Sequence, residues 1–330
     1  MSGRPPGLSD VAARAGVSHQ TVSRVLNAHP HVAERTRSRV QQAIAELGYR
    51  RNMSARLLAT GQSDVLGVIA LNSTLYGPSA TVSALSSAAA GREMTLTVQH
   101  IQEFDEPVVR AAVDRLVSHG VAALLVILPV RPAAELLARV VPSSLPVVTV
   151  DGPPGGANVS VDQYAGGVLA TQHLLDSGHP TVWHVAGPQE WNDSRAREQG
   201  WRDTLAAAGA EAPPLLRGDW SPVSGYEAGL LLARVPECSA VFVANDHMAL
   251  GVARALAERG RRVPDDVALV GFDDLPESAY FFPPLTTVHQ DFAEVGRQSL
   301  DLLLHPRDDA TAPVLPVLIP PRLVRRASSG

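Results

Sequence analysis

The sequence predicts a small all-α head built around a helix-turn-helix, followed by a larger α/β core of two doubly wound subdomains. In the first sixty or so residues, apolar side chains repeat at helical spacing on both sides of Gly16. From residue 64 onward, short runs rich in Val, Ile and Leu alternate with helical stretches, a pattern typical of parallel sheets covered on both faces. A chain of 330 residues is long enough for two or three domains.

The charges divide the chain at the same place. All 28 basic residues are arginine; nine lie in residues 1–61 beside only three acidic residues, which gives this part a net charge of +6. The remainder holds 19 arginines and 30 acidic residues, a net charge of −11. A basic head on an acidic body indicates that the head alone meets a polyanion. A basic, solvated tail is the alternative.

Composition excludes several classes of protein. A hydrophobic content of 45% with 18% charged residues is typical of a folded globular chain. The single cysteine, Cys238, excludes an internal disulfide framework and a thiolate-rich metal cluster, and we expect it to be a small buried hydrophobe. No apolar run approaches the roughly 18 residues of a membrane span, and the N-terminus lacks the apolar stretch of a secretory signal. We therefore expect a cytoplasmic protein with no membrane partner.

The head is predicted to contain three helices. Ser9 and Ser18 are expected to cap the first two, and Gly16 supplies the permissive backbone of the tight turn between them. The third helix is predicted over 34–47 and ends at Gly48. The apolar stripes of the second and third helices are Val22, Val25, Leu26, Val40, Ala43, Ile44 and Leu47.

A helix-turn-helix places its second helix in the major groove of DNA. The polar face of this helix carries Gln20, Ser23, Arg24 and Asn27, with His19 at its start. Gln20 can pair bidentately with adenine and Arg24 with guanine, each contributing about 1–3 kcal/mol of discrimination. A three-helix bundle that binds no DNA is the alternative. Residues 50–63 are predicted to be a linker that is too short to form a stable helix alone.

In the core we predict strands at 65–71, 95–101, 123–128, 147–150, 182–185, 240–243 and 267–270, with two more at 315–320 and 322–324. Helices are predicted at 107–118, 165–177, 194–208 and 247–259. Polar residues follow several of these strands, and ligands of open parallel sheets bind beyond the carboxyl ends of the strands. The polar residues are Asp151, Asn245, Asp246, Asp273 and Asp274.

These side chains suit a polyhydroxy ligand, because each hydroxyl both donates and accepts a hydrogen bond. Arg197 offers a rigid fork that can span two neighbouring hydroxyls, and Trp220 could cover one face of a sugar. For any one strand-end Asp, a helix N-cap is an equal alternative, and we expect Asp246 to be such a cap. Trp220 could instead be a core residue.

Enzyme signatures are absent from the sequence. There is no nucleophile elbow, no Walker loop and no Gly-x-Gly-x-x-Gly after a first strand. His173 and His179 have no third ligand at metal-binding spacing. We therefore expect no catalytic residue, no metal and no cofactor. A sugar-processing enzyme that uses two of the strand-end carboxylates is a remote alternative.

Specific motifs now point to a family. The run Asp10-Val-Ala-Ala-Arg-Ala-Gly-Val-Ser-His-Gln-Thr-Val-Ser-Arg-Val-Leu-Asn27 resembles the DNA-binding head of the LacI/GalR family of bacterial transcription repressors. The resemblance continues through 32–37, 45–49 and 51–59. In the core it is strongest to the lactose-responsive branch, at 218–226, 243–251 and 284–292. It covers about residues 8 to 326.

The resemblance implies a domain plan. The head would be 1–49 and a hinge 50–63, followed by a core, 64–330, like that of the periplasmic sugar-binding proteins, with three crossovers between its subdomains. One subdomain would comprise about 64–162 and 290–319, and the other 163–289 and 320–330. The DNA contacts carried over by position are His19, Gln20, Thr21, Arg24, Asn27, Asn52 and Leu58. Leu58 would be an apolar wedge in the minor groove, and Asn52 and Arg56 could hold phosphates.

The effector contacts carried over by position are Leu75, Pro78, Asp151, Asp193, Arg197, Trp220, Asn245, Asp273, Gln290 and Phe292. Three residues depart from the lactose-responsive branch: Asp193 replaces serine, Ile127 replaces asparagine, and Glu103 aligns with arginine. The effector implied by the resemblance is a galactoside, and a different sugar or linkage is the alternative.

The function implied is that of a repressor of carbohydrate-utilisation genes, which a sugar releases from its operator. The alternative is a repressor that acts with a co-repressor. The family implies a homodimer on a pseudopalindromic operator. No leucine heptad tail follows the last strand, so we expect a dimer and not a tetramer. Phe281 and Phe282 are candidate interface anchors, with core packing as the alternative. A solute-binding protein would share the core but not residues 8–60.

Overall fold

The computed structural model describes residues 6–26, 29–49, 63–71, 74–127, 130, 133–152, 157–305 and 316–330. The chain divides into two compact units, Met1–Ser63 and Asp64–Gly330, which we call the head and the core. In the described ranges, no helix has both the length and the apolar character that crossing a membrane requires.

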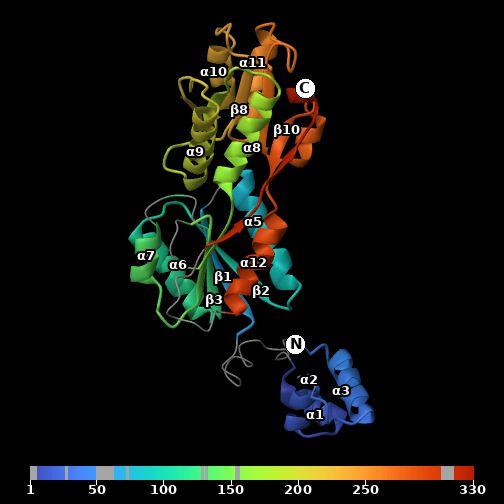
Figure 1. Cartoon of the computed structure of the whole chain (residues 1–330). Helices are drawn as coiled ribbons and strands as arrows, with labels where there is room; N and C mark the ends of the chain where they lie inside the picture. Colours follow the sequence, from blue (N-terminus) through green and yellow to red (C-terminus); the bar gives the residue numbers. More distant parts are fainter. Residues whose placement is uncertain are drawn as a thin grey trace. The chain divides into compact units, whose positions relative to one another are not determined.

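The head contains the three predicted helices, α1 (Leu8–Ala15), α2 (His19–Leu26) and α3 (Glu34–Leu47) (Figure 1). Gly16 ends α1 with φ at +61°, in the left-handed region. Ser18 caps α2 as predicted, because its Oγ accepts a hydrogen bond from Thr21 N at 3.2 Å. The prediction of Ser9 as the first cap is wrong. The cap is Gly7, whose N donates to the carboxylate of Asp10 at 2.7 Å.

The turn between α1 and α2 is held by an arginine from α3. Arg39 Nε donates to Ala15 O at 3.1 Å and Arg39 Nη2 donates to Gly16 O at 3.0 Å. Around this turn the head buries Val11, Ala12, Ala15, Val22, Val25, Val40, Ala43 and Tyr49. Ile44 and Leu47, which were predicted to be buried, are half-buried at the edge of this cluster.

The core contains two six-stranded sheets. The first has the order β11-β5-β4-β3-β1-β2 and is parallel throughout. The second has the order β12-β10-β9-β8-β6-β7 and is parallel except for β12. The strands are β1 (Val65–Leu71), β2 (Thr95–Ile101), β3 (Ala123–Ile127), β4 (Val147–Val150), β5 (Asn158–Val161), β6 (Trp183–Ala186), β7 (Leu216–Arg217), β8 (Ala240–Val243), β9 (Ala268–Asp273), β10 (Thr286–His289), β11 (Val317–Ile319) and β12 (Arg322–Val324).

Helices cover both faces of each sheet, so the core has two lobes, each of which is an α/β sandwich (Figure 1). The first lobe carries α5 (Tyr76–Ala90), α6 (Glu106–Ser118), α7 (Ala133–Val140) and α12 (Phe292–Leu304). The second carries α8 (Gln163–Asp176), α9 (Asn192–Ala207), α10 (Pro222–Leu232) and α11 (Asp246–Glu258), and short 3-10 helices at Pro276–Tyr280 and Ala327–Ser329. All nine predicted core strands and all four predicted core helices overlap observed ones. The sequence analysis missed β5, β7, β10, α5, α7, α10 and α12.

Glycines bring two helices of the second lobe into backbone contact. A Cβ on Gly200 of α9 would lie 2.3 Å from Tyr164 O of α8, and a Cβ on Gly167 of α8 would lie 2.4 Å from Arg197 O of α9. No side chain fits between the two helices at these points, so α8 fixes the backbone of α9 at Arg197.

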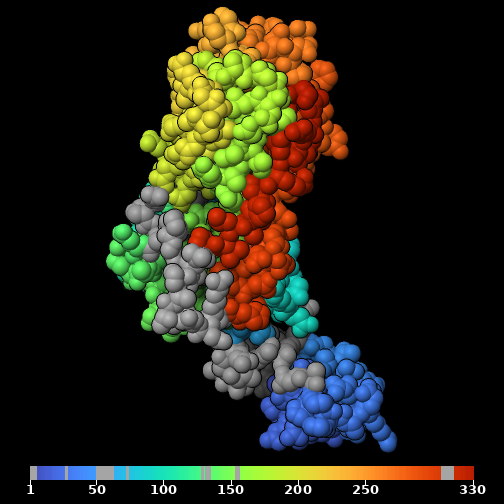
Figure 2. Space-filling model, viewed as in Figure 1, coloured from blue at the N-terminus to red at the C-terminus, as the bar shows by residue number. Residues whose placement is uncertain are grey.

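The chain passes between the sheets three times: from β5 to α8, from β10 to α12, and from β11 to β12. The first crossing consists of Asp162 alone and the third of Pro320 and Pro321. Since β11 pairs with β5, and β12 pairs with β10, the crossings lie next to one another. In Figure 2 the C-terminal segment (red) lies on the surface of both lobes.

Candidate functional site

The exposed face of α2 carries three of the predicted DNA contacts. His19, Gln20 and Arg24 are exposed, whereas Val22 and Val25 point into the head core. Thr21 is half-buried, with its Oγ1 2.9 Å from the hydroxyl of Ser18. Helix α2 therefore presents donors and acceptors on one side while its apolar side anchors it. Three other predicted contacts, Asn27, Asn52 and Leu58, lie outside the described residues, as does Arg56.

A cavity of about 500 Å³, its open mouth included, lies between the two lobes of the core. The ten predicted effector contacts all line it: Leu75, Pro78, Asp151, Asp193, Arg197, Trp220, Asn245, Asp273, Gln290 and Phe292. Ile127 also lines it. Glu103 does not line the cavity: it is exposed in the loop after β2.

The sheet topology explains why these residues meet. Asp151 and Gln290 directly follow β4 and β10, Asn245 is the second residue after β8, and Asp273 is the last residue of β9. The carboxyl ends of parallel strands share one edge of a sheet, and here the edges of the two sheets face the same cavity. The amino-terminal turns of α5, α9 and α12 complete the wall.

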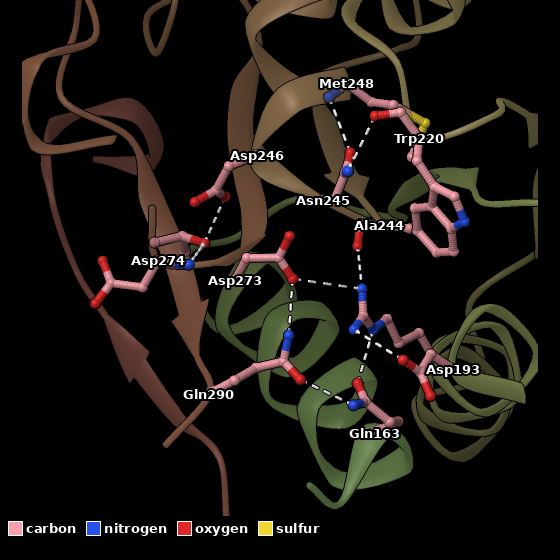
Figure 3. Close-up of polar contacts among 12 residues, drawn as sticks. Gln163, Asp193, Trp220, Ala244, Asn245, Asp246, Met248, Asp273, Asp274 and Gln290 are labelled. Carbon is pink, nitrogen blue, oxygen red and sulfur yellow. Dashed lines mark hydrogen bonds and ion pairs between the residues drawn. The ribbon is translucent and has the colours of Figure 1, made fainter. Parts of the chain in front are cut away.

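Arg197 is one of four polar side chains that form a closed ring of contacts. Its Nε donates to Gln163 Oε1 at 2.8 Å, Gln163 Nε2 donates to Gln290 Oε1 at 2.8 Å, and Gln290 Nε2 donates to Asp273 Oδ1 at 2.8 Å (Figure 3). Asp273 Oδ1 in turn lies 3.8 Å from Arg197 Nη1. All four side chains are buried. The ring therefore fixes the guanidinium and the carboxylate before any ligand enters.

The guanidinium of Arg197 has two further supports. Its Nη1 donates to Ala244 O at 2.5 Å, and its central carbon lies 3.7 Å from the centre of the Phe272 ring. Asp193, one helical turn away on α9, lies 3.9 Å from Nη2. The planar guanidinium therefore has an aromatic ring on one face and carboxylates at its edge, an arrangement that favours arginine over lysine.

Burial dominates the electrostatics of the cavity. It raises the pKa of Asp273 to about 8, although Arg197 and the hydrogen bond from Gln290 act in the opposite direction. Burial likewise raises the pKa of Asp151 well above its ordinary value, and Asp193 adds to this effect. The pKa of Asp193 is raised by burial and lowered by Arg197. Three acidic side chains, whose protonated forms burial favours, thus lie around one guanidinium.

The helix cap at this edge is Asn245 and not Asp246. Asn245 Oδ1 accepts from Met248 N at 2.9 Å, and its Nδ2 donates to Trp220 O at 3.1 Å. Asp246 is buried, and its carboxylate accepts hydrogen bonds from three groups elsewhere in the lobe. Burial raises the pKa of Asp246 to about 6. The donors are Leu275 N, Ser278 Oγ and Thr287 Oγ1, at 2.9, 2.6 and 2.6 Å.

Trp220 belongs both to the core and to the cavity wall. It is 5% exposed, packs in the apolar cluster of the second lobe and has φ at +73°. Asp151 and Asp273 also have positive φ, at 56° and 108°. Residues held in such sparsely populated conformations cluster at ligand sites. In this cavity, the positive φ of these three residues gives their side chains directions that a regular strand would not allow.

Sequence reasoning missed several wall residues. Tyr76 and Trp191 line the cavity, with their rings 5.8 Å from Phe292 and 5.6 Å from Trp220. Gln163, which closes the ring around Arg197, was missed too. No local pattern in the sequence marks Gln163, because its partners Arg197 and Gln290 are distant in the chain.

The histidines and the cysteine considered in the sequence analysis have structural roles. His173 Nε2 is 2.8 Å from Ser329 Oγ, and His179 Nδ1 is 3.0 Å from Ser239 Oγ. Cys238 is buried as expected, and burial raises the pKa of its thiol to about 12. Within the described ranges, no three His, Cys, Asp or Glu residues are grouped so that they could hold a metal ion.

Comparison with known proteins decides the family. Residues 7–52 match the model for bacterial regulatory proteins of the lacI family, and residues 171–329 match a periplasmic binding protein-like domain. The chain is 35% identical to the lactose operon repressor of Escherichia coli (strain K12) over 306 residues, which cover 91% of this chain and 84% of that protein. The chain belongs to the lacI family. It is a DNA-binding transcriptional repressor of that family, with a periplasmic binding protein-like core.

Solved structures of lacI-family proteins share the fold. A lac repressor dimer bound to operator and the anti-inducer ONPF has a TM-score of 0.88 at 34% identity and covers 99% of both chains. The transcriptional regulator CelR in complex with cellobiose has a TM-score of 0.71 at 32% identity and covers 98% of this chain and all of that one. The predicted helical head and two-lobed α/β core are therefore confirmed.

Proposed function

We propose that this protein binds a pseudopalindromic operator as a homodimer and is released when a sugar, a galactoside in the first instance, enters the core cavity. The observation that carries the proposal is the buried ring of Arg197, Gln163, Gln290 and Asp273. It turns a rigid set of donors and acceptors toward the cavity, and sugar hydroxyls need both. Trp220 supplies an apolar surface for the face of a pyranose ring.

The exposed polar face of α2 supports the DNA-binding half of the proposal. Gln20 would recognise adenine and Arg24 guanine, with His19 beside them. By resemblance to the family, Asn27 and Asn52 would contact DNA and Leu58 would enter the minor groove. The basic charge of the head supports phosphate contacts that weaken as the salt concentration rises.

Release by the effector requires that the two sites are coupled. The effector must weaken operator binding by the same factor by which the operator weakens effector binding. Asp193 and Ile127, the two cavity residues that differ from the lactose-responsive branch, are the reason to test other sugars beside galactosides. The cellobiose complex of CelR supports the inclusion of β-glucosides in the same panel.

A homodimer is proposed on the same basis. Phe282 is fully exposed, and Phe281 is half-buried against the apolar cluster of the second lobe. Phe282 is therefore the candidate anchor, because aromatic residues are enriched at interfaces relative to the rest of the surface. Light scattering of the full chain at micromolar concentration should give the mass of a dimer, and of a monomer after Phe282→Ser. A tetramer would contradict the proposal.

The decisive experiment measures operator binding and its release by sugar in one assay. Duplexes that the full chain retains from a random library define its operator, and a gel shift with that operator then measures release by lactose, allolactose, galactose and cellobiose. An active sugar should weaken the shift. Arg197→Ala should raise the required sugar concentration by about 10- to 150-fold, as expected for lost hydrogen bonds to a charged group.

Arg202→Ala is the matched control for this assay, because Arg202 lies on the same helix, is half-exposed and does not line this cavity. It should respond like the wild type. If the sugar instead tightens operator binding, it is a co-repressor and not an inducer. No response to any sugar, with operator binding intact, would refute the sugar effector and leave a repressor of the family.

A further inference from the structure

Two exposed histidines lie close together in the head. His29 and His31 belong to the turn between α2 and α3, and the centres of their rings are 5.6 Å apart. Neither residue is among the DNA contacts expected from the sequence, and the proposed function uses neither. The turn therefore places two titratable side chains within a few ångströms of each other on the surface of the DNA-binding head.

Two hydrogen bonds fix this turn against both neighbouring helices. His29 N donates to Arg24 O at 2.9 Å, and Arg37 Nη2 donates to His29 O at 3.3 Å. Arg24 lies on the exposed polar face of α2, so the turn adjoins the C-terminal end of that face. A recognition helix directs its N-terminal residues to the bases. Its C-terminal end, and the turn with it, then lies nearer the edge of the groove, where the phosphates are.

The charged groups around the two histidines are mainly cationic. Arg24 comes from α2, and Arg35 and Arg37 come from α3. Glu34, the first residue of α3, is the acidic group beside them, and its carboxylate lies 3.7 Å from Arg37 Nε. The turn thus has more positive than negative charge around it even when both histidines are neutral, which favours the approach of an anion.

Protonation of the two histidines and binding of a phosphate favour each other. The neutral ring of His29 accepts from His31 N at Nδ1, but this contact is long, at 3.5 Å, and little is lost when a proton replaces it. Two charged rings at this separation repel each other in the free head. A phosphate that accepts from both rings offsets the repulsion. Histidine changes its charge between about pH 5 and pH 8, so the charge of the turn changes in that range.

We propose that His29 and His31 form a proton-dependent contact with the DNA phosphates beside the bases that α2 reads. This inference rests on DNA binding by the head and adds a contact whose strength depends on pH. Phosphate contacts carry no sequence information. The turn therefore strengthens binding to operator and to unrelated DNA alike as the pH falls from 8 to 6.

The test is fluorescence anisotropy of the full chain with its selected operator, and with a scrambled duplex, at pH 6, 7 and 8. The wild type should bind both duplexes about tenfold or more tightly at pH 6 than at pH 8, as expected for a hydrogen bond to a charged group. The slope of log affinity against log salt should be steeper at pH 6, by about 0.9 for each phosphate contacted. The double variant His29→Gln/His31→Gln should match the wild type within about twofold at pH 8, where the rings are neutral, and should lose the gain at pH 6.

His119→Gln is the matched control, because His119 is an exposed histidine of the core, at the end of α6; it should keep the full gain. His19→Gln changes the third histidine of the head and should also keep the gain, even where it weakens binding at every pH. Burial raises the pKa of Asp246 to about 6 and that of Asp273 to about 8, but both residues remain in the double variant. The difference between wild type and double variant therefore isolates the turn.

Equal affinity of the wild type at pH 6 and pH 8 would overturn the proposal. A double variant that is weakened by the same factor at both pH values would overturn it too, because the turn would then have only a structural role. So would a gain that disappears in His19→Gln, or a gain on the operator that the scrambled duplex does not show. If the wild type binds no duplex at any pH, this inference and the proposed operator binding both fail.

Discussion

Replacing Asp273 with asparagine should flatten the dependence of core stability on pH. Burial raises the pKa of Asp273 to about 8 from an ordinary 3.8. Between these two values the folded protein holds a proton that the unfolded chain has released. The free energy of unfolding therefore falls as the pH rises through this window, by about 1.4 kcal/mol per pH unit, and this stabilisation is fully present only below pH 4.

From pH 5 to pH 7 the contribution of this one group amounts to about 3 kcal/mol. Asparagine keeps an Oδ1 that can accept from Gln290 Nε2 and has no carboxyl proton to lose. Asp151, Asp193 and Asp246, whose pKa values are raised by burial in the same direction, remain in both proteins. The difference between wild type and variant therefore isolates Asp273.

Urea denaturation at pH 5, 6 and 7 measures this effect. Tryptophan fluorescence follows the core alone, because all four tryptophans lie in residues 64–330. The wild type should lose about 3 kcal/mol more than Asp273→Asn between pH 5 and pH 7. Asp265→Asn, at an exposed carboxylate, should keep the slope of the wild type. Equal slopes in the wild type and in Asp273→Asn would refute the argument that burial holds a proton on this side chain.

Three other substitutions test how two glycines and one arginine stabilise the head and the second lobe of the core. Gly16→Ala puts a Cβ on a left-handed backbone and should destabilise the head by about 1–2 kcal/mol, seen as a lower melting temperature by circular dichroism; Gly91→Ala, at a right-handed backbone with ordinary contacts, should melt like the wild type. Arg39→Met removes the donors to the turn carbonyls and should destabilise the head by about 1–3 kcal/mol, so unchanged melting would rule out this role. Gly167→Ala should push α8 and α9 apart and lower the free energy of unfolding in urea by about 1–3 kcal/mol. It should also weaken sugar binding measured by calorimetry. Wild-type values in both assays would mean that the two helices can move apart without loss of stability.

Features that depend on nearby residues could be predicted from the sequence. Gly16 and Gly48 end helices because each adopts a left-handed backbone, at φ of +61° in both cases. Asp151 and Asn245 could be placed near a ligand because they follow buried apolar runs. Helix α5 could not be predicted, because its alanines and serines give no clear apolar stripe.

Features that depend on distant contacts were missed or assigned wrongly. Asn245 and Asp246 are adjacent and both suit an N-cap, and the choice depends on Ser278 and Thr287, which are 32 and 41 residues from Asp246. Gln163 acquires its role only when Arg197, 34 residues away, and Gln290, 127 residues away, approach it. No local pattern carries that information.

The three neighbouring crossings between the lobes have a mechanical consequence. Pro320 and Pro321 have no backbone N–H, so the crossing between β11 and β12 donates no ladder hydrogen bond that a change in the angle between the lobes would break. Each sheet is stiff and fully paired, whereas the crossings are short and lie side by side. We therefore expect a change in the angle between the lobes to turn about these crossings. A ligand held between Arg197 and Asp151, one from each lobe, selects an angle of that rotation without deforming either lobe.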